Sequence, residues 1–238
     1  MKFLWFLPNT FTFLNLFFGC VAVVLGLNGD LEALAVFVLL GLVCDFLDGF
    51  FARMLNVKSR LGVQLDSLSD IVSFGLTSSI VIFVLLKKSN YIIDNGESNL
   101  YLQLIPYTSF LITIASSYRL AKFNLSSTDS FFIGLPTPAN ALFIVFLPFL
   151  FKNNIIFPGS DLLNNTFFLL FVLLLSSYLL ICNLKMFSFK NINFSIKDNL
   201  SFNLFIITAL CLIIAYSFAA FPLIIAIYIF VNLLGIKF

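Results

Sequence analysis

The chain has 238 residues, of which 61% are hydrophobic and 10% are charged, and its formal net charge is +2. Its mean hydropathy is +1.09. Soluble domains carry about 25% charged residues, so this composition excludes an ordinary water-soluble protein, and a charge of +2 gives no reason to expect a nucleic-acid partner. We expect an all-α integral membrane protein: a polytopic bundle of about eight transmembrane helices, forming a single membrane-embedded domain over residues 1–238.

The cysteine and histidine content limits which metal ligands, disulfides and general bases are to be expected. The four cysteines are scattered through apolar segments without CxxC spacing, which favours small buried residues over disulfides or metal ligands. The chain has no histidine, which disfavours a zinc site and leaves a carboxylate as the expected general base. No cleavable signal peptide is evident, because the first apolar run is long and lacks a small-residue cleavage site.

The first predicted span runs from Pro8, which suits the first turn of a helix, to about Leu27. Asn9, Thr12 and Asn15 follow at three-residue steps and share one face of this helix. Two interpretations stay open for that face. It forms hydrogen bonds between helices, or it is a polar wall that faces a functional site.

The second and third predicted spans, roughly 32–51 and 66–86, are joined by a short turn through residues 56–60. The second ends in Asp45 and Asp48, three residues apart, and the third begins with Asp66 and Asp70, four apart. Side chains at these spacings lie on one face of a helix, about 4.5 Å and about 6 Å apart along the axis. An antiparallel helix pair therefore brings four carboxylates toward one volume.

Four carboxylates in one volume point to bound cations. Like charges so close do not all stay ionised unless cations lie between them, and hard divalent ions such as Mg²⁺ or Mn²⁺ prefer oxygen ligands. One carboxylate pair at a helix end is usually a solvated cap. Here the flanks are apolar enough for a membrane, where a charge costs roughly 2.5–3.5 kcal/mol, so we expect an interior, functional site.

Small and basic residues surround the aspartates. Gly49 and Ala52 share the face of Asp45 and Asp48, and they leave space for a bulky ligand. Arg53 and Gly62 flank the turn between the two spans, and Arg53 is placed to hold a phosphate.

The later spans are predicted at roughly 101–122, 139–151 and 165–184, with two more between 201 and 236 joined by a hairpin near Pro222. Arg119 and Lys122 lie one turn apart at the end of the fourth span. They either anchor the end of that helix or bind an anion in the pocket of the aspartates. Two prolines in the GLPTPAN stretch, residues 134–140, start the fifth span.

The basic residues predict an orientation. With eight spans, ten of the 13 fall on one side of the membrane and three, Lys87, Lys88 and Lys152, on the other. This bias places both termini and the aspartate segment at the cytoplasmic face. The ten are Lys2, Arg53, Lys58, Arg60, Arg119, Lys122, Lys185, Lys190, Lys197 and Lys237.

A carboxylate-bound metal site with a carboxylate base, at the cytoplasmic face of a membrane, suits phosphoryl transfer on a lipid pyrophosphate or phosphodiester. Reasoning from the residues alone ends there.

The aspartate segment also resembles a family signature. D-x2-D-G-x2-A-R-x8-G-x3-D-x3-D is similar to the motif of the CDP-alcohol phosphatidyltransferases, and every fixed position is filled. The resemblance implies a six-helix core, here with two further helices, a homodimer, and transfer of a phosphatidyl group from CDP-diacylglycerol to an alcohol with release of CMP.

Residue roles follow from the same resemblance. Asp45, Asp48 and Asp66 would hold two Mg²⁺ or Mn²⁺ ions, and Asp70 would be the general base and would also touch a metal. The nucleotide and pyrophosphate site would be lined by Gly49, Ala52, Arg53 and Gly62, with Asn9 and Thr12 from the polar face of the first span.

LPNTFTFLNLFFG, DSLSDIVSFG and the YRLAKFN…GLPTPAN stretches resemble the branch of the family that uses L-serine. The serine carboxylate would be held by Arg119 or Lys122, and the enzyme would lie in a bacterial cytoplasmic membrane among its lipid substrates.

Two alternatives are weighed against this prediction. A phosphatidylglycerophosphate synthase would perform the same chemistry on a phosphorylated acceptor, for which a richer basic pocket is expected. A divalent-cation or lipid transporter would use the aspartates as a binding site, but such proteins often show inverted repeats, which this sequence lacks.

Overall fold

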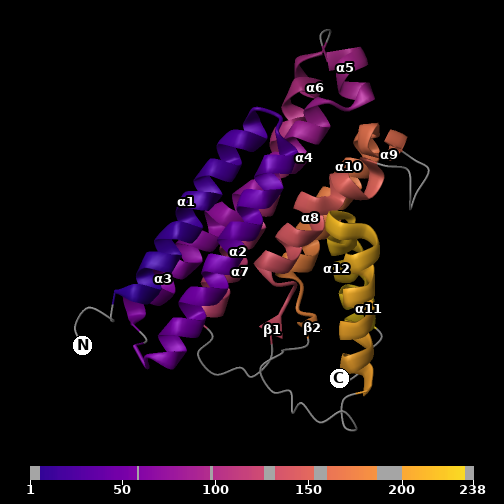
Figure 1. The fold of residues 1–238 in the computed structure, drawn as a ribbon. Helices are drawn as coiled ribbons and strands as arrows, with labels where there is room; N and C mark the ends of the chain where they lie inside the picture. The colour runs from indigo at the N-terminus through magenta and orange to yellow at the C-terminus, as the bar shows by residue number, and fades with distance from the viewer. Residues whose placement is uncertain are drawn as a thin grey trace.

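The computed structural model describes residues 6–57, 59–96, 99–125, 132–152, 160–186 and 200–233. Within them the protein is a helical bundle, and the β structure is one antiparallel pair of two-residue strands (Figure 1). The predicted all-α class is confirmed. The elements are α1 (Leu7–Leu27), α2 (Leu31–Met54), α3 (Arg60–Asp70), η2 (Ile71–Leu76), α4 (Thr77–Lys87), α5 (Asn90–Gly96), α6 (Leu100–Leu104), η3 (Ile105–Phe110), α7 (Leu111–Leu125), β1 (Phe132–Ile133), α8 (Thr137–Lys152), α9 (Ser160–Asn164), α10 (Thr166–Ile181), β2 (Lys185–Met186), α11 (Leu200–Tyr216), η5 (Ser217–Ala219) and α12 (Ala220–Leu233).

Within these described ranges, five continuous helical runs are long and apolar enough to cross a membrane, and two shorter apolar helices accompany them. The last run, Leu204–Leu233, is divided by η5, where Ser217 has a φ of 50°. Four undivided runs, two shorter helices and the two halves of the last run give the eight spans that the sequence predicts. The hairpin near Pro222 is confirmed as well, because α11 runs beside α12 (Figure 1) and the ring centroids of Phe205 and Tyr228 lie 6.3 Å apart.

Local signals set the ends of the first helices. Pro8 lies in the first turn of α1, and Gly29 adopts a φ of 85° in the turn that follows. The Asp30 carboxylate then accepts a hydrogen bond from the Ala33 N–H at 2.9 Å and caps α2. The third span begins at Arg60 rather than near Asp66, because Ser59 caps α3 by accepting from the Gly62 N–H at 2.9 Å.

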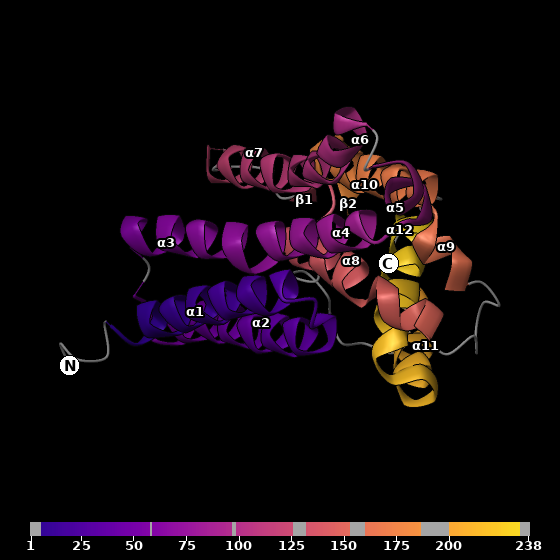
Figure 2. The same ribbon diagram turned by 90° about the horizontal axis from the view of Figure 1, so that it is seen from above.

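The run from Arg60 to Lys87 is the centre of the bundle. Its apolar stretch is 72% buried inside the protein, against 33% for that of α2. Seen from above, α1 and α2 lie on one side of this run, and α7 and α10 lie on the other (Figure 2). Because the run touches both sides, it carries its aspartates between two sets of helices.

This central run contains one π-helical segment, η2, directly after Asp70. A π turn interrupts the regular hydrogen bonds of the α-helix backbone. Hydroxyl groups four residues further on bind two carbonyls of this segment: Thr77 donates to Ser73 O and Ser78 donates to Phe74 O, both at 2.6 Å. A Cβ on Gly75 would meet the Ser116 Cβ at 3.1 Å, so this glycine lets α7 approach η2 closely.

The fourth span begins at Leu100 and is not a uniform α-helix, since it passes through the 3₁₀ segment η3, which contains Pro106 near its start. The polar stretch before it contains the short helix α5. The sixth span ends at Ile181, three residues before the predicted Leu184. Of the residues behind the predicted orientation, Lys2, Lys58, Lys190, Lys197 and Lys237 lie outside the described residues.

Candidate active site

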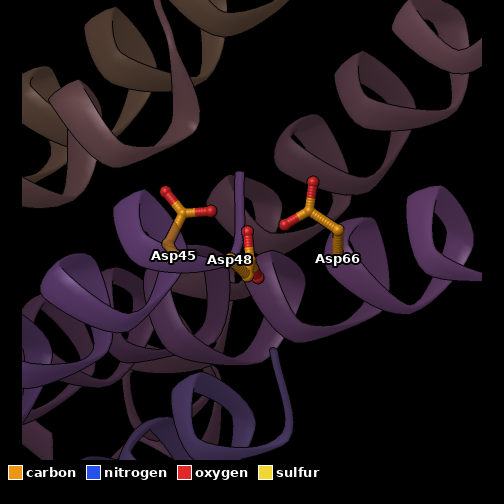
Figure 3. A group of neighbouring side chains, drawn as sticks. All are labelled: Asp45, Asp48 and Asp66. Carbon is orange, nitrogen blue, oxygen red and sulfur yellow. The ribbon is translucent and has the colours of Figure 1, made fainter. Parts of the chain in front are cut away.

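The aspartates of the second and third spans come together in space. One carboxylate oxygen from each of Asp45, Asp48 and Asp66 lies within 4.8 Å of the others. Figure 3 shows Asp45 and Asp66 pointing toward each other, with Asp48 between them. Asp48 is 6% exposed and Asp45 and Asp66 are half-buried, so the group lies at the edge of the protein interior.

The fourth aspartate has a different place. Asp70 is 7% exposed and lies one turn beyond Asp66 on α3, outside the group of three that could share a cation. Spacing alone predicts all four carboxylates in one volume. In the structure three of them converge, and Asp70 lies beside this group.

The first helix connects the two aspartate-bearing helices, because α1 packs against both α2 and α3. The Thr12 hydroxyl donates to Asp48 Oδ2 at 2.7 Å, and the Asn15 amide donates to Asp70 Oδ1 at 3.3 Å. Both interpretations of the polar face of the first span therefore apply, since Thr12 bonds to another helix and also lines the cavity described next.

A cavity of about 700 Å³ opens beside the aspartates at this end of the bundle. It lies among the N-terminal ends of α1, α3 and α8 and the C-terminal ends of α2 and α7. Its wall includes every residue that the sequence places in the site except Asp45 and Lys122: Asn9, Thr12, Asp48, Gly49, Ala52, Arg53, Gly62, Asp66, Asp70 and Arg119.

The glycines of the motif have close neighbours. A Cβ on Gly49 would lie 3.4 Å from Nη1 of Arg53, so the guanidinium folds back over this glycine, four residues before it. A Cβ on Gly62 would lie 3.0 Å from Ser59 Oγ and 3.3 Å from Asn9 Oδ1. Both glycines therefore leave space that neighbouring side chains of the cavity wall occupy, Arg53 at Gly49 and Ser59 with Asn9 at Gly62.

The opposite wall of the cavity contains a buried, positively charged side chain. Arg119 on α7 is 8% exposed, and its Nη1 donates to the Thr137 hydroxyl at 3.1 Å. Its Nε is buried without a hydrogen-bond partner in the described structure. Because Arg119 also lines the cavity, its guanidinium is suited to bind an anionic group of a ligand.

Lys122 lies elsewhere. Its side chain is exposed, donates to Asn183 Oδ1 at 3.0 Å and is not part of the cavity wall. Asn124 does line the cavity, and its amide donates to Ser67 Oγ at 2.9 Å, which joins α7 to α3. The two basic residues that the sequence pairs are therefore separated by the fold.

Several wall residues were not predicted as part of the site. Pro136, Pro138 and Asn124 line the cavity, and Thr137 binds Arg119. The GLPTPAN stretch that contains three of them predicts a helix start and resembles the serine branch of the family, but neither places it in the cavity wall. Its position depends on distant partners, because the Leu135 N–H donates to Leu179 O at 2.9 Å and β1 pairs with β2.

The three converging carboxylates fit a divalent cation. Their oxygens are hard ligands at a suitable mutual distance, and Asp66 Oδ1 is buried without a hydrogen-bond partner in the described structure. Such an orphaned acceptor among like charges is what a cation site would contain.

Comparison with known proteins agrees with this site. The model of the family "CDP-alcohol phosphatidyltransferase" matches residues 5–182. Since this is most of the chain, the protein belongs to the CDP-alcohol phosphatidyltransferase family. The match takes in the cavity walls and ends before α11 and α12. Membership also decides against the transporter alternative.

Individual relatives carry a more specific name. A CDP-diacylglycerol–serine O-phosphatidyltransferase of Helicobacter pylori is 29% identical over 197 residues, which cover 82% of this chain and 77% of that protein. Proteins of the same name from Methanocaldococcus jannaschii and Bacillus subtilis are 33% identical over 134 residues and 28% identical over 152 residues. These cover 56% and 62% of this chain, and 56% and 77% of the relatives.

Proposed function

We propose that this protein transfers the phosphatidyl group of CDP-diacylglycerol to the hydroxyl of L-serine, giving phosphatidylserine and CMP. The observation that carries the proposal is one cavity with three converging carboxylates on one wall, the buried Asp70 beside them and the buried Arg119 opposite. The names of the relatives support serine as the acceptor.

Asp45, Asp48 and Asp66 would hold two divalent cations, Mg²⁺ or Mn²⁺. When bound, such ions would stabilise the negative charge that develops on the phosphate oxygens. Arg53 lies over Gly49 on the same side of the cavity and would add a charge-assisted hydrogen bond to the pyrophosphate. Gly49, Ala52 and Gly62 would line the nucleotide site, beside Asn9 and Thr12.

Asp70 would be the general base. It takes the proton from the serine hydroxyl while the serine oxygen forms a bond to the phosphorus that carries diacylglycerol. The bond from that phosphorus to the CMP oxygen breaks, and CMP leaves with the bonding electrons. A buried carboxylate next to the cation site, but outside the group of three, is suited to this role, because the other three aspartates supply the cation ligands.

Arg119 would recognise the acceptor. Serine differs from uncharged alcohols by its carboxylate, and a planar guanidinium binds a carboxylate with two donors. Thr137 holds Nη1 of Arg119, and the Arg119 side chain lines the cavity. This geometry supports an anion-bearing acceptor. Lys122, which the sequence offered for the same task, points to Asn183.

We further propose that the cavity opens at the cytoplasmic face of a bacterial inner membrane, as the distribution of basic residues predicts. Large apolar side chains are exposed along α1, α2 and α7, and this supports contact with lipid or with a second copy of the chain. Assembly as a homodimer stays a prediction from the family resemblance.

An acceptor panel tests the proposal. Purified protein in detergent is given CDP-diacylglycerol and Mn²⁺ or Mg²⁺ with serine, glycerol 3-phosphate or inositol phosphate, and CMP and lipid products are measured. We expect CMP release that depends on serine and yields phosphatidylserine. Turnover with glycerol 3-phosphate and none with serine would move the assignment to the phosphatidylglycerophosphate synthase alternative. No turnover with any acceptor would reject the proposed activity.

A further inference from the structure

Asn15 on α1 does not line the cavity, yet it touches a carboxylate that does. Its Nδ2 donates to Asp70 Oδ1 at 3.3 Å, and its side chain is 0% exposed. One turn earlier, Thr12 donates to Asp48 Oδ2 at 2.7 Å. The same face of α1 therefore supports one aspartate from α2 and one from α3.

The helical run that contains Asp70 also bonds to the backbone of α1 at and near Asn15. The Ser73 hydroxyl donates to Asn15 O at 2.8 Å, and the Ser69 hydroxyl donates to Thr12 O at 3.2 Å. Ser69 and Ser73 stand on either side of Asp70, in α3 and in the π-helical segment η2. The backbone around Asp70 is thus tied to α1 before and after this residue.

Two glycines make this arrangement possible. A Cβ on Gly19 would lie 2.7 Å from Ser73 Cα, so η2 approaches α1 more closely than another residue would allow. A Cβ on Gly41 of α2 would lie 2.9 Å from Asn15 Oδ1. The side-chain amide therefore lies in a slot between a glycine of α2 and the aspartate of α3.

The orientation of the amide follows from its two neighbours. Asn15 Oδ1 lies on the Gly41 side and is buried without a hydrogen-bond partner in the described structure. A rotated amide would turn this oxygen toward the Asp70 carboxylate, where two acceptors would repel each other. Leaving a buried carbonyl unsatisfied is costly, but this orientation presents a donor to Asp70.

We propose that Asn15 is the positioning residue of Asp70: it holds one oxygen of this carboxylate from behind the cavity wall and so sets the direction in which the base faces the acceptor. This rests on the proposed function, in which Asp70 takes the acceptor proton. An amide suits the task because it donates a hydrogen bond without adding a charge that would compete with the cation site. Thr12 would position the Asp48 carboxylate in the same way.

The test compares variants on the same face of α1. Asn15→Ala and the similar-sized Asn15→Leu remove the donor, and Thr12→Val removes the bond to Asp48. For each purified variant we measure kcat, the KM of CDP-diacylglycerol, and the rise in Tm on adding Mn²⁺ without substrate. The last measurement reports the cation site independently of turnover.

For Asn15→Ala we expect kcat to fall about 10- to 100-fold, as when a catalytic group is slightly misplaced. The KM of CDP-diacylglycerol and the Mn²⁺-induced rise in Tm should stay within about twofold of the wild type. Thr12→Val should instead shift the Mn²⁺ concentration needed for the rise, because its partner belongs to the cation cluster; outer partners of metal ligands typically matter about 10- to 100-fold.

A wild-type kcat in folded Asn15→Ala would overturn the inference, and so would an equal loss of the Mn²⁺ response, which would indicate general damage to the site. If Asn15→Ala and Asn15→Leu do not fold, Ser73→Ala takes their place. It frees the Asn15 backbone but keeps the amide, and it should lower kcat about threefold to tenfold, the effect of one hydrogen bond, with the Mn²⁺ response intact; an unchanged kcat would then overturn the inference. An inactive wild type would reject the proposed function itself, which is a distinct outcome.

Discussion

The two walls of the cavity are built in different ways. The acidic wall comes from α2 and α3, whose aspartates lie three and four residues apart on one helix face. The cationic wall comes from α7 and the start of α8, where Arg119 donates a hydrogen bond to Thr137. Between these two residues in the chain lies β1, which pairs with β2. The first wall depends on short-range periodicity and the second on long-range packing. We infer that the first wall carries the chemistry of the family and the second selects the acceptor.

This comparison predicts that damage to the acidic wall abolishes turnover, whereas damage to the cationic wall weakens only the use of the acceptor.

Asp66→Asn should have the largest effect. It removes a ligand of the proposed cation site, and such ions stabilise transition states by several kcal/mol, so we expect a loss of at least about 10⁴-fold in kcat. The Mn²⁺-induced rise in Tm should be lost with it. If Asp66→Asn keeps both activity and the Mn²⁺ response, the cation site lies elsewhere.

Asp70→Asn should lower kcat by about 10²- to 10⁴-fold, the usual contribution of a general base. Unlike Asp66→Asn, it should keep the Mn²⁺-induced rise in Tm, because Asp70 lies outside the converging group. Loss of that rise would make Asp70 a cation ligand and would remove the distinction drawn between the two aspartates of α3.

Arg119→Met tests the cationic wall with a side chain of similar length. We expect the KM of serine to rise about 10- to 100-fold, since a hydrogen bond to a charged group contributes about 1.5–3 kcal/mol. The KM of CDP-diacylglycerol should change by no more than about twofold. A change confined to CDP-diacylglycerol would place Arg119 at the phosphate instead of the acceptor.

Thr137→Val should have a smaller effect of the same kind. It removes the partner that holds Nη1 of Arg119 and keeps the shape of the side chain, so we expect a rise of about threefold to tenfold in the KM of serine. Thr137→Ser retains the hydroxyl and is the matched control, which should behave like the wild type. An equal defect in both variants would argue against the hydrogen bond as the cause.

Lys122→Met should change the KM of serine by no more than about twofold. Its side chain is exposed and bonds to Asn183, so surface effects of this size are expected. Lys122 lies one turn from Arg119 on the same helix, which makes this variant the closest control for Arg119→Met. A tenfold rise would mean that the acceptor reaches beyond the cavity described here.

Much of the acidic wall followed from the sequence. Asp45 and Asp48, and then Asp66 and Asp70, were placed on two helix faces by spacing, and the turn between the helices was placed at residues 56–60, close to its actual position between Met54 and Arg60. The number of spans and the final hairpin followed from the lengths of the apolar runs. These features are local, because helix periodicity and membrane thickness act on short stretches of chain.

Residue types, their helix faces and the apolar lengths can thus be read from the chain alone. The packing of the helices is needed to place α1 against both aspartate helices, to leave Asp70 outside the converging group of three, and to turn Arg119 but not Lys122 toward the cavity. The rotation of a helix about its axis is set by its neighbours, which the local sequence does not specify. Here the close approach of Ser116 to Gly75 turns that face of α7 inward, and Arg119 lies one turn further along it.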